Sequence, residues 1–115
     1  MTQDESFPRK HRLHKSGDFR RIFSRGKRIP SQNFVLYALP TNLPYSRLGI
    51  QVRSRIGNAV RRNYIKRIVR EAFRRKKGDF TRSIDLIFIA EKGSAELKYA
   101  MLTQEFEQAV SRYLK

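Results

Sequence analysis

The side chains that could do acid–base or metal chemistry in this sequence are few and scattered. His11 and His14 are the two histidines, three residues apart in a basic segment without a neighbouring carboxylate, and the chain has no cysteine. A metal or general-base site needs such groups to converge, so we interpret both histidines as surface or phosphate-contacting residues. Asp85 opens an apolar segment, where it could accept backbone hydrogen bonds. Without paired carboxylates, an activated serine or a glycine-rich phosphate loop, the sequence predicts no catalytic and no metal-binding residue in the protein.

The side chains that could bind a polyanion are concentrated in residues 57–77, which read GNAVRRNYIKRIVREAFRRKK. From Asn58 onward this stretch holds nine basic residues against one acid, Glu71. Like charges four residues apart destabilise an isolated helix by about 0.2–0.5 kcal/mol per pair, and a bound polyanion would offset that repulsion. A solvated helix face is the alternative interpretation. Because the charge is almost purely positive, we favour nucleic acid as the partner.

A second basic stretch, residues 9–28, also holds nine basic residues against one acid, Asp18. The formal net charge of the chain is +16, so these two stretches carry all of the excess positive charge. No stretch approaches the roughly 18 apolar residues of a membrane span, and the first ten residues lack the apolar core of a secretory signal. We therefore expect a cytoplasmic protein that binds neither a membrane nor a small-molecule substrate. It should form one RNA-binding domain over residues 1–115, with a disordered tail at residues 1–8.

Residues 57–77 have the spacing of a helix that is anchored on one side. We expect Asn58 to cap its start and Gly78 to end it in a left-handed turn. The apolar residues that recur at intervals of three and four, and so should face a core, are Ile65, Ile68, Val69, Ala72 and Phe73. The polar residues that project to the opposite side are Asn63, Lys66, Arg67, Arg70 and Arg74.

The first basic stretch predicts a short helix, with Ser16 as a possible cap and Gly26 as a possible end. Asp18 would suit the positive N-terminal end of its dipole. Phe19 and Phe23 share one face of this helix. They are either core residues or, among several arginines, a partly exposed surface on which unpaired bases stack.

The strands are predicted from runs of β-forming residues. Residues 34–39 and 47–52 should pair as a hairpin, and Arg53 to Arg55 could add a third strand before the basic helix. Residues 84–90 read IDLIFIA, which is typical of an inner strand covered on both faces. Tyr37 could rim the core or belong to an aromatic RNA-binding face.

A last helix after residue 93 completes the order α-β-β-β-α-β-α. We therefore predict an α/β fold of the α+β sandwich type, a single small domain whose mixed four-stranded sheet is packed with helices. The residues of the last helix that fall on one apolar stripe are Tyr99, Leu102, Phe106, Ala109, Val110 and Tyr113.

The basic helix resembles the signature helix of the protein subunit of bacterial ribonuclease P. The pieces that carry this resemblance are Gly57-Asn58-Ala59-Val60, Arg62-Asn63, Lys66-Arg67 and Arg70-Glu71-Ala72-Phe73. The similarity extends from about Arg9 to Leu114, with further matching pieces in the same order. These include Asp18-Phe19, Ile22-Phe23 with Gly26, Phe34-Val35-Leu36-Tyr37, Arg47-Leu48-Gly49-Ile50, Asp85-Leu86-Ile87 and Ala95-Glu96-Leu97.

The resemblance implies both a fold and a function. The signature helix would make a left-handed β-α-β crossover between parallel strands, against the usual right-handed rule. The complex would remove the 5′ leader from precursor transfer RNA by endonucleolytic cleavage. Its RNA subunit would be the catalyst and would hold most of the Mg²⁺, so the protein alone should be inactive. The protein would bind the catalytic RNA and the leader.

The resemblance also assigns residues to these two partners. The residues implied in binding the catalytic RNA are Arg53, Arg55, Asn58, Arg61, Arg62, Asn63, Lys66, Arg67, Arg70 and Arg74. Those implied in binding the leader are Arg12, Lys15, Phe19, Phe23 and Tyr37. Two positions depart from the family pattern: Tyr64 stands where an arginine is usual, and Ser54 with Arg55 stands where a basic pair is usual.

Two other functions fit parts of the sequence. A ribosomal or general RNA-binding protein without a role in cleavage would have the same composition, but its RNA affinity would not depend on a leader. A basic helix lying on an anionic membrane is disfavoured, because the apolar side of the helix is needed to cover the sheet.

Overall fold

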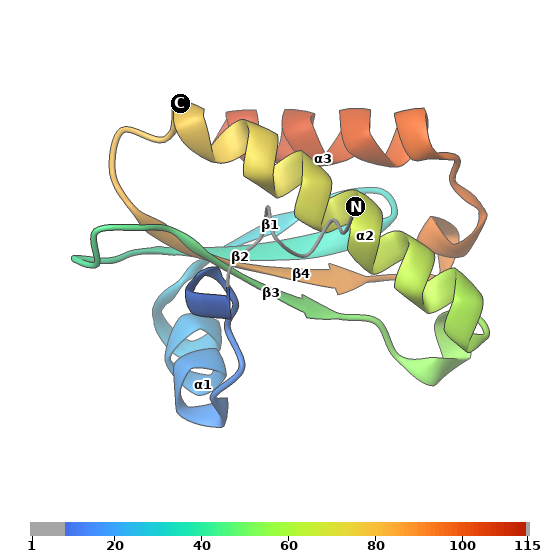
Figure 1. The fold of residues 1–115 in the computed structure, drawn as a ribbon, viewed down its shortest axis with the longest axis horizontal. Helices are drawn as coiled ribbons and strands as arrows, with labels where there is room; N and C mark the ends of the chain where they lie inside the picture. The colour runs from blue at the N-terminus through green and yellow to red at the C-terminus, as the bar shows by residue number, and fades with distance from the viewer. Residues whose placement is uncertain (1–8, 115) are drawn as a thin grey trace.

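The structure, a computed structural model, describes residues 9–114, so the predicted disordered tail at residues 1–8 lies outside the described part. The described residues form three α-helices and one four-stranded sheet (Figure 1). The elements are α1 (Ser16–Arg25), β1 (Lys27–Pro30), β2 (Phe34–Pro40), β3 (Arg47–Gln51), α2 (Ala59–Lys76), β4 (Ile84–Ala90) and α3 (Tyr99–Leu114).

The strand order β1-β2-β4-β3 places β4 inside the sheet. β4 pairs antiparallel with β2 and parallel with β3. The predicted hairpin between residues 34–39 and 47–52 is therefore wrong, because β4 lies between those two strands. Six of the seven β4 residues are buried, and such an apolar strand is stabilised most where helices cover both of its faces.

The hairpin in the sheet joins β1 and β2 instead, in antiparallel register. Sequence reasoning missed β1 because its four residues show no apolar alternation and Ile29 is the buried one. Residues 53–55 do not form a strand: Ser54–Ile56 make a 3₁₀ turn that leads from β3 into α2. The predicted element order and the mixed four-stranded sheet are nevertheless confirmed, because β1 supplies the strand that residues 53–55 do not.

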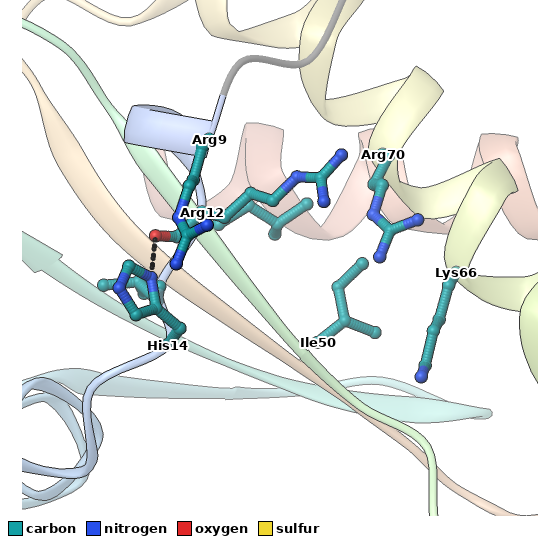
Figure 2. Close-up of a pocket in the computed structure, with 8 residues that line it drawn as sticks. Arg9, Arg12, His14, Ile50, Lys66 and Arg70 are labelled. Atoms are coloured by element: carbon teal, nitrogen blue, oxygen red, sulfur yellow. Dashed lines mark hydrogen bonds between the residues drawn. The ribbon is translucent and has the colours of Figure 1, made fainter. Parts of the chain in front are cut away.

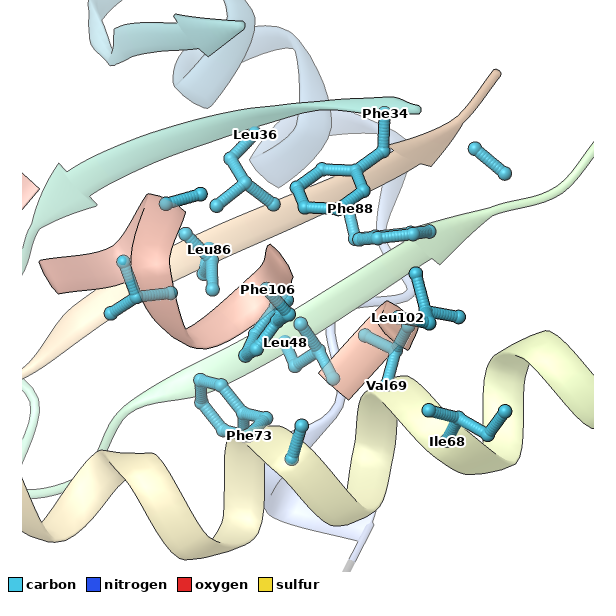
Figure 3. Close-up of a cluster of buried hydrophobic side chains, with 14 of the residues drawn as sticks. Phe34, Leu36, Leu48, Ile68, Val69, Phe73, Leu86, Phe88, Leu102 and Phe106 are labelled. Carbon is cyan, nitrogen blue, oxygen red and sulfur yellow. The ribbon is translucent and has the colours of Figure 1, made fainter. Parts of the chain in front are cut away.

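The connection from β3 through α2 to β4 joins two parallel neighbouring strands. In Figure 1, β3 lies in front of β4 while α2 runs back above the sheet, opposite to the strand direction. Figure 3 gives the same arrangement from the helical side. The crossover is left-handed, as the family resemblance implies.

One face of the sheet is covered by α2 and α3 and holds the main core (Figures 1 and 3). All five apolar residues predicted on the inner side of α2 are buried there. This burial confirms the prediction that the apolar side of α2 covers the sheet. No helix in the described part of the chain is long and apolar enough to cross a membrane. The strand and helix side chains that Figure 3 labels in this core are Phe34, Leu36, Leu48, Ile68, Val69, Phe73, Leu86, Phe88, Leu102 and Phe106.

The opposite face of the sheet is covered by α1 (Figure 1). A small cluster of Leu13, Ile22 and Ile87 is buried there. Side chains of β2 and β4 alternate between the two faces, and the partly buried residues that pack on this cluster are Phe19, Tyr37, Leu39 and Ile89.

The helix ends follow the predictions in part. The Asn58 side chain caps α2 by accepting the Arg61 N–H at 2.9 Å. Gly78 does not adopt a left-handed conformation; α2 ends at Lys76, Lys77 follows it in right-handed geometry, and a 3₁₀ turn continues over Lys77–Asp79. Ser16 is the first residue of α1 rather than its cap. Gly26 follows the last residue of α1 as predicted, and a side chain is excluded there because a Cβ would lie 2.5 Å from the Ile22 carbonyl oxygen.

Candidate nucleic-acid interface

A buried ionic network fixes α1 to the sheet. Asp85 on β4 is fully buried and accepts two hydrogen bonds from Arg47 of β3, at 2.9 Å (Nε–Oδ1) and 2.7 Å (Nη2–Oδ2). Arg21 of α1 donates to the same carboxylate at 2.9 Å and to Asp18 at 3.0 Å. Asp18 also lies 3.4 Å from Arg47. The hydrogen bond to Asp85 raises the pKa of Arg47 against the opposing effect of burial.

This network changes two expectations. The side chain of Asp85 accepts hydrogen bonds from arginine side chains rather than from the backbone. Arg21, counted in the sequence as part of the basic stretch, is paired with both aspartates. A carboxylate at the start of an apolar strand signals such a network, because a buried charge needs an opposite charge beside it.

Three aromatic side chains predicted to bind the leader meet where α1 lies on the sheet. Phe23 contacts Tyr37 edge to face, with ring centroids 5.0 Å apart and planes at 88°. The ring of Phe19 lies 6.3 Å from that of Phe23. Phe23 is 37% exposed, so the group is neither fully core nor fully solvent-facing.

Gly49 on β3 determines where Phe19 lies. A Cβ at residue 49 would be 2.8 Å from the ring of Phe19, so the absence of a side chain lets the ring rest on the strand. The sequence of β3 thus helps to hold the aromatic group in place, together with the ionic network.

The two basic residues predicted to bind the leader lie apart from each other. Lys15 is exposed directly before α1, the helix that carries Phe19 and Phe23. Arg12 pairs with Leu48 at the edge of β3, and its side chain lines a groove toward α2.

That groove, of about 510 Å³, runs between the N-terminal segment and α2. Figure 2 shows Arg9 and Arg12 on one side and Lys66 and Arg70 on the other, with Ile50 between them. His14 lies at the rim, its Nδ1 3.3 Å from the Arg12 carbonyl oxygen. Among the described residues, those that line the groove include no acid. The groove therefore joins one predicted leader-binding residue to two residues predicted to bind the catalytic RNA.

The outer side of α2 carries most of the residues predicted to bind the catalytic RNA. Asn63 and Arg67 are exposed, as are Arg53, Arg55 and Asn58 before the helix. Lys66 and Arg70 are partly exposed beside them.

Arg74, Arg62 and Arg61, all predicted to bind the catalytic RNA, contact other groups of the protein. Arg74 donates to Glu71 at 3.3 and 2.5 Å, and this hydrogen bonding raises the pKa of Arg74. Arg62 donates to the Gly57 carbonyl oxygen at 2.7 Å. The guanidinium of Arg61 lies 5.2 Å from the ring centroid of Tyr64, so the unusual tyrosine supports a neighbouring cation.

Metal-binding groups do not converge in the described part of the chain: no three histidine, aspartate or glutamate side chains lie together as a metal site would require. The carboxylates of Asp18, Asp85 and Glu71 are each paired with arginines. The arrangement of charges and aromatic rings on this surface is suited to binding RNA.

Comparison with known proteins places this chain among relatives of one kind. The family model for ribonuclease P matches residues 7–114. The ribonuclease P protein component of Thermotoga maritima is 42% identical over 90% of this chain and 82% of its own length. That of Bacillus cereus is 39% identical over 79% of this chain and 80% of its own length.

Solved structures agree with the sequence relatives. The ribonuclease P protein of Staphylococcus aureus superposes with a TM-score of 0.84 at 32% identity, over 90% of this chain and 94% of that one. The Thermotoga maritima protein gives a TM-score of 0.79 at 34% identity, over 88% of this chain and 96% of that one. This chain therefore belongs to the ribonuclease P protein component family, whose members act with an RNA partner in an endoribonuclease complex that processes transfer RNA.

Proposed function

We propose that this protein binds the catalytic RNA of ribonuclease P and the 5′ leader of precursor transfer RNA, and so promotes Mg²⁺-dependent removal of the leader. The observation that carries the proposal is that two unlike surfaces lie on one small domain. The aromatic group lies on α1 and β2. The cationic face lies on α2, where Lys66 and Arg70 border a groove whose other side is lined by Arg9 and Arg12. Each surface suits a different form of RNA.

The aromatic group would bind the single-stranded leader. Rings of Phe19, Phe23 and Tyr37 can stack on unpaired bases whatever their sequence, which contributes about 1–3 kcal/mol per base. Lys15 would contact a leader phosphate. Because leaders of different precursors differ in sequence, contacts that do not select a base suit this substrate.

The face of α2 would bind the catalytic RNA through phosphate contacts. The residues proposed for this contact remain those of the family resemblance, with Asn63, Lys66, Arg67 and Arg70 at its centre. Arg61, Arg62 and Arg74 would contribute while keeping their partners in the protein, since a guanidinium has five N–H donors. Neutralising phosphates would let the RNA and the precursor approach each other at lower magnesium concentration.

Hydrolysis would depend on the RNA rather than on protein side chains. In this proposal Mg²⁺ is held mainly by RNA, because Asp18 and Asp85 already accept hydrogen bonds from Arg21 and Arg47. The protein would hold and orient both RNAs, and alone it should not cleave.

The direct test is cleavage of a 5′-labelled precursor transfer RNA at low magnesium. A bacterial ribonuclease P RNA would be assayed with the protein, without it, and the protein assayed alone. Cleavage only when both are present would support the proposal. If the protein binds RNA but changes neither rate nor leader dependence, it is a general RNA-binding protein.

A further inference from the structure

A cluster of four side chains lies at the C-terminal end of α2, outside both surfaces described above. It is formed by Lys10 and His11 of the 3₁₀ turn Arg9–His11, Tyr45 between β2 and β3, and Lys77 directly after α2. We refer to these four residues as the Lys77 cluster. None of them belongs to the residues assigned so far to the leader or to the catalytic RNA.

The geometry of the Lys77 cluster is compact. The His11 and Tyr45 rings stack with centroids 5.3 Å apart and planes within 3° of parallel. Lys77 Nζ lies 3.0 Å from His11 Nδ1, so the ammonium donates and that ring nitrogen accepts. Lys10 Nζ lies 5.3 Å from the centroid of the Tyr45 ring. Two ammonium groups thus flank a pair of stacked rings.

The cations of the Lys77 cluster repel one another. Burial lowers the pKa of Lys77, and Arg74 and Lys10 lower it further. Burial likewise lowers the pKa of His11, with Lys77 and Lys10 adding to the effect.

The carboxylates closest in sequence to Lys77 pair with other cations. Asp79 lies 3.3 Å from Lys76, and Glu71 pairs with Arg74 and Arg75. An anion bound at Lys77 would therefore relieve repulsion without having to break these ion pairs.

The position of the cluster indicates which anion it would meet. At about 100° per residue, Lys77 falls on the same side of α2 as Lys66 and Arg70, roughly two turns beyond Arg70. The cluster therefore lies in line with Lys66 and Arg70, which border the groove, and Lys10 directly follows Arg9, which lines the groove's other side. A polyanion that follows α2 would pass both sites.

We propose that the Lys77 cluster binds a phosphodiester group of RNA, with Lys10 and Lys77 contacting the phosphate and the His11–Tyr45 stack lying beside the nucleotide. This inference rests on the proposed RNA-binding function and extends it to the far end of α2. The geometry favours the catalytic RNA as the source, because the same helix carries its proposed contacts.

The test compares Lys77→Gln with Lys76→Gln. Both variants lose one positive charge at neighbouring positions, but Lys76 is paired with Asp79. Dissociation constants would be measured over a range of salt concentrations, for the catalytic RNA and for precursor transfer RNA separately. Urea unfolding would confirm that both variants are folded.

We expect Lys77→Gln to weaken binding about tenfold, and Lys76→Gln about twofold or less. Loss of one phosphate contact should also reduce the log–log salt slope by about 0.7–0.9 for Lys77→Gln. A loss confined to the catalytic RNA would support the site and assign it to that subunit, and a loss confined to the precursor would support the site and assign it to the substrate. Equal effects of the two variants on both RNAs would overturn the inference.

A second measurement follows the His11 ring by NMR with and without RNA. A phosphate nearby should raise the pKa of His11, so binding should take up a proton and tighten as the pH falls from 8 to 6. His11→Gln should reduce this pH dependence. An unchanged pKa of His11 in the complex would contradict the proposal. If wild-type protein still stimulates leader removal in the same preparation, the proposed function stands even where the cluster fails.

Discussion

The two faces of the sheet are covered by helices that are held in different ways. On one face, α2 buries Ile65, Ile68, Val69, Ala72 and Phe73 in the main core. On the other, the ten-residue α1 buries Ile22, and its polar side is tied to the strands through Arg21 and Asp18. Apolar burial leaves the outside of α2 available for cations. Ionic anchoring lets α1 keep two phenylalanines partly exposed at the sheet.

This contrast explains how a small protein can present two binding surfaces. A short helix with little apolar contact is marginal by itself, so α1 depends on the network that holds it. The position of the aromatic group should therefore be sensitive to charges that never touch RNA, whereas the face of α2 should not. Four experiments test this difference between the two faces.

The largest effect is expected from Asp85→Asn. Removing one partner of a buried ionic network costs about 3–5 kcal/mol, so the free energy of unfolding in urea should fall by that amount. At temperatures where the variant is folded, affinity for leader-bearing precursor should fall more than affinity for the catalytic RNA. Glu71→Gln, which alters a partly exposed pair with Arg74, should change the free energy of unfolding little, because solvent screens exposed ion pairs. Similar costs for the two variants would remove the distinction between the faces.

Gly49→Ala tests whether β3 positions the Phe19 ring, without changing any charge. The added methyl group would lie 2.8 Å from the Phe19 ring, and such overpacking typically costs about 1–3 kcal/mol. Displacing the ring should reduce the preference for leader-bearing precursor. Gly78→Ala is the matched control, because no atom lies within 4 Å of the position of its added Cβ. Equal leader preference in the two variants would show that β3 does not position Phe19.

Phe19→Ala and Arg67→Ala compare the two surfaces directly in binding. Phe19→Ala should lower affinity for leader-bearing precursor by about 1–3 kcal/mol, the contribution of one stacked base, and leave mature transfer RNA unaffected. Arg67→Ala should weaken binding of the catalytic RNA and leave the leader preference intact. Dissociation constants for the three RNAs are the measurement. An equal loss with precursor and mature transfer RNA on changing Phe19 would refute its assignment to the leader.

The smallest loss of stability is expected from changing Glu105 of α3, which lies on the side of the sheet opposite α1. Glu105 of α3 accepts hydrogen bonds from Ser31 at 2.5 Å and from the Asn33 backbone and side chain at 2.9 and 2.8 Å. Burial raises the pKa of Glu105, but these hydrogen bonds outweigh it and lower the pKa below its ordinary value.

A lowered pKa in the folded state means that Glu105 stabilises the protein above the pKa of an unfolded glutamate, about 4.3. That stability should be lost as the pH falls through the folded value. Glu105→Gln should cost about 1 kcal/mol at pH 7 and flatten the pH dependence of the free energy of unfolding below about pH 4.3. Parallel pH profiles for the two proteins would show that the hydrogen bonds do not stabilise the ionised form.

Much of the fold could be predicted from local patterns. The spacing of Ile65 to Phe73 specified the buried side of α2, and the nearly continuous apolar run of residues 84–90 specified an inner strand. The pairing partners could not be read locally, because two strands adjacent in sequence can be separated in space by a third that comes much later. The wrong hairpin between residues 34–39 and 47–52 has this cause.

The candidate interface could likewise be predicted only in part. Phe19, Phe23 and Tyr37 were predicted to form one group, and the structure brings them together. The pairing of Arg21 and Arg47 with aspartates far along the chain was missed, because charge counts do not reveal which arginines are neutralised. The residues assigned to the two RNAs stay predictions.

The central place of β4 has a consequence for how the chain acquires its structure. β2 and β3 hydrogen-bond to β4, not to each other, yet β4 begins at Ile84. A growing chain therefore exposes α1, the β1–β2 hairpin, β3 and the cationic α2 before the strand that unites them has been synthesised. The complete sheet can form only after the last third of the chain has been synthesised. Because its strand pairings are non-local, we expect the sheet to form slowly and cooperatively rather than strand by strand from the N-terminus.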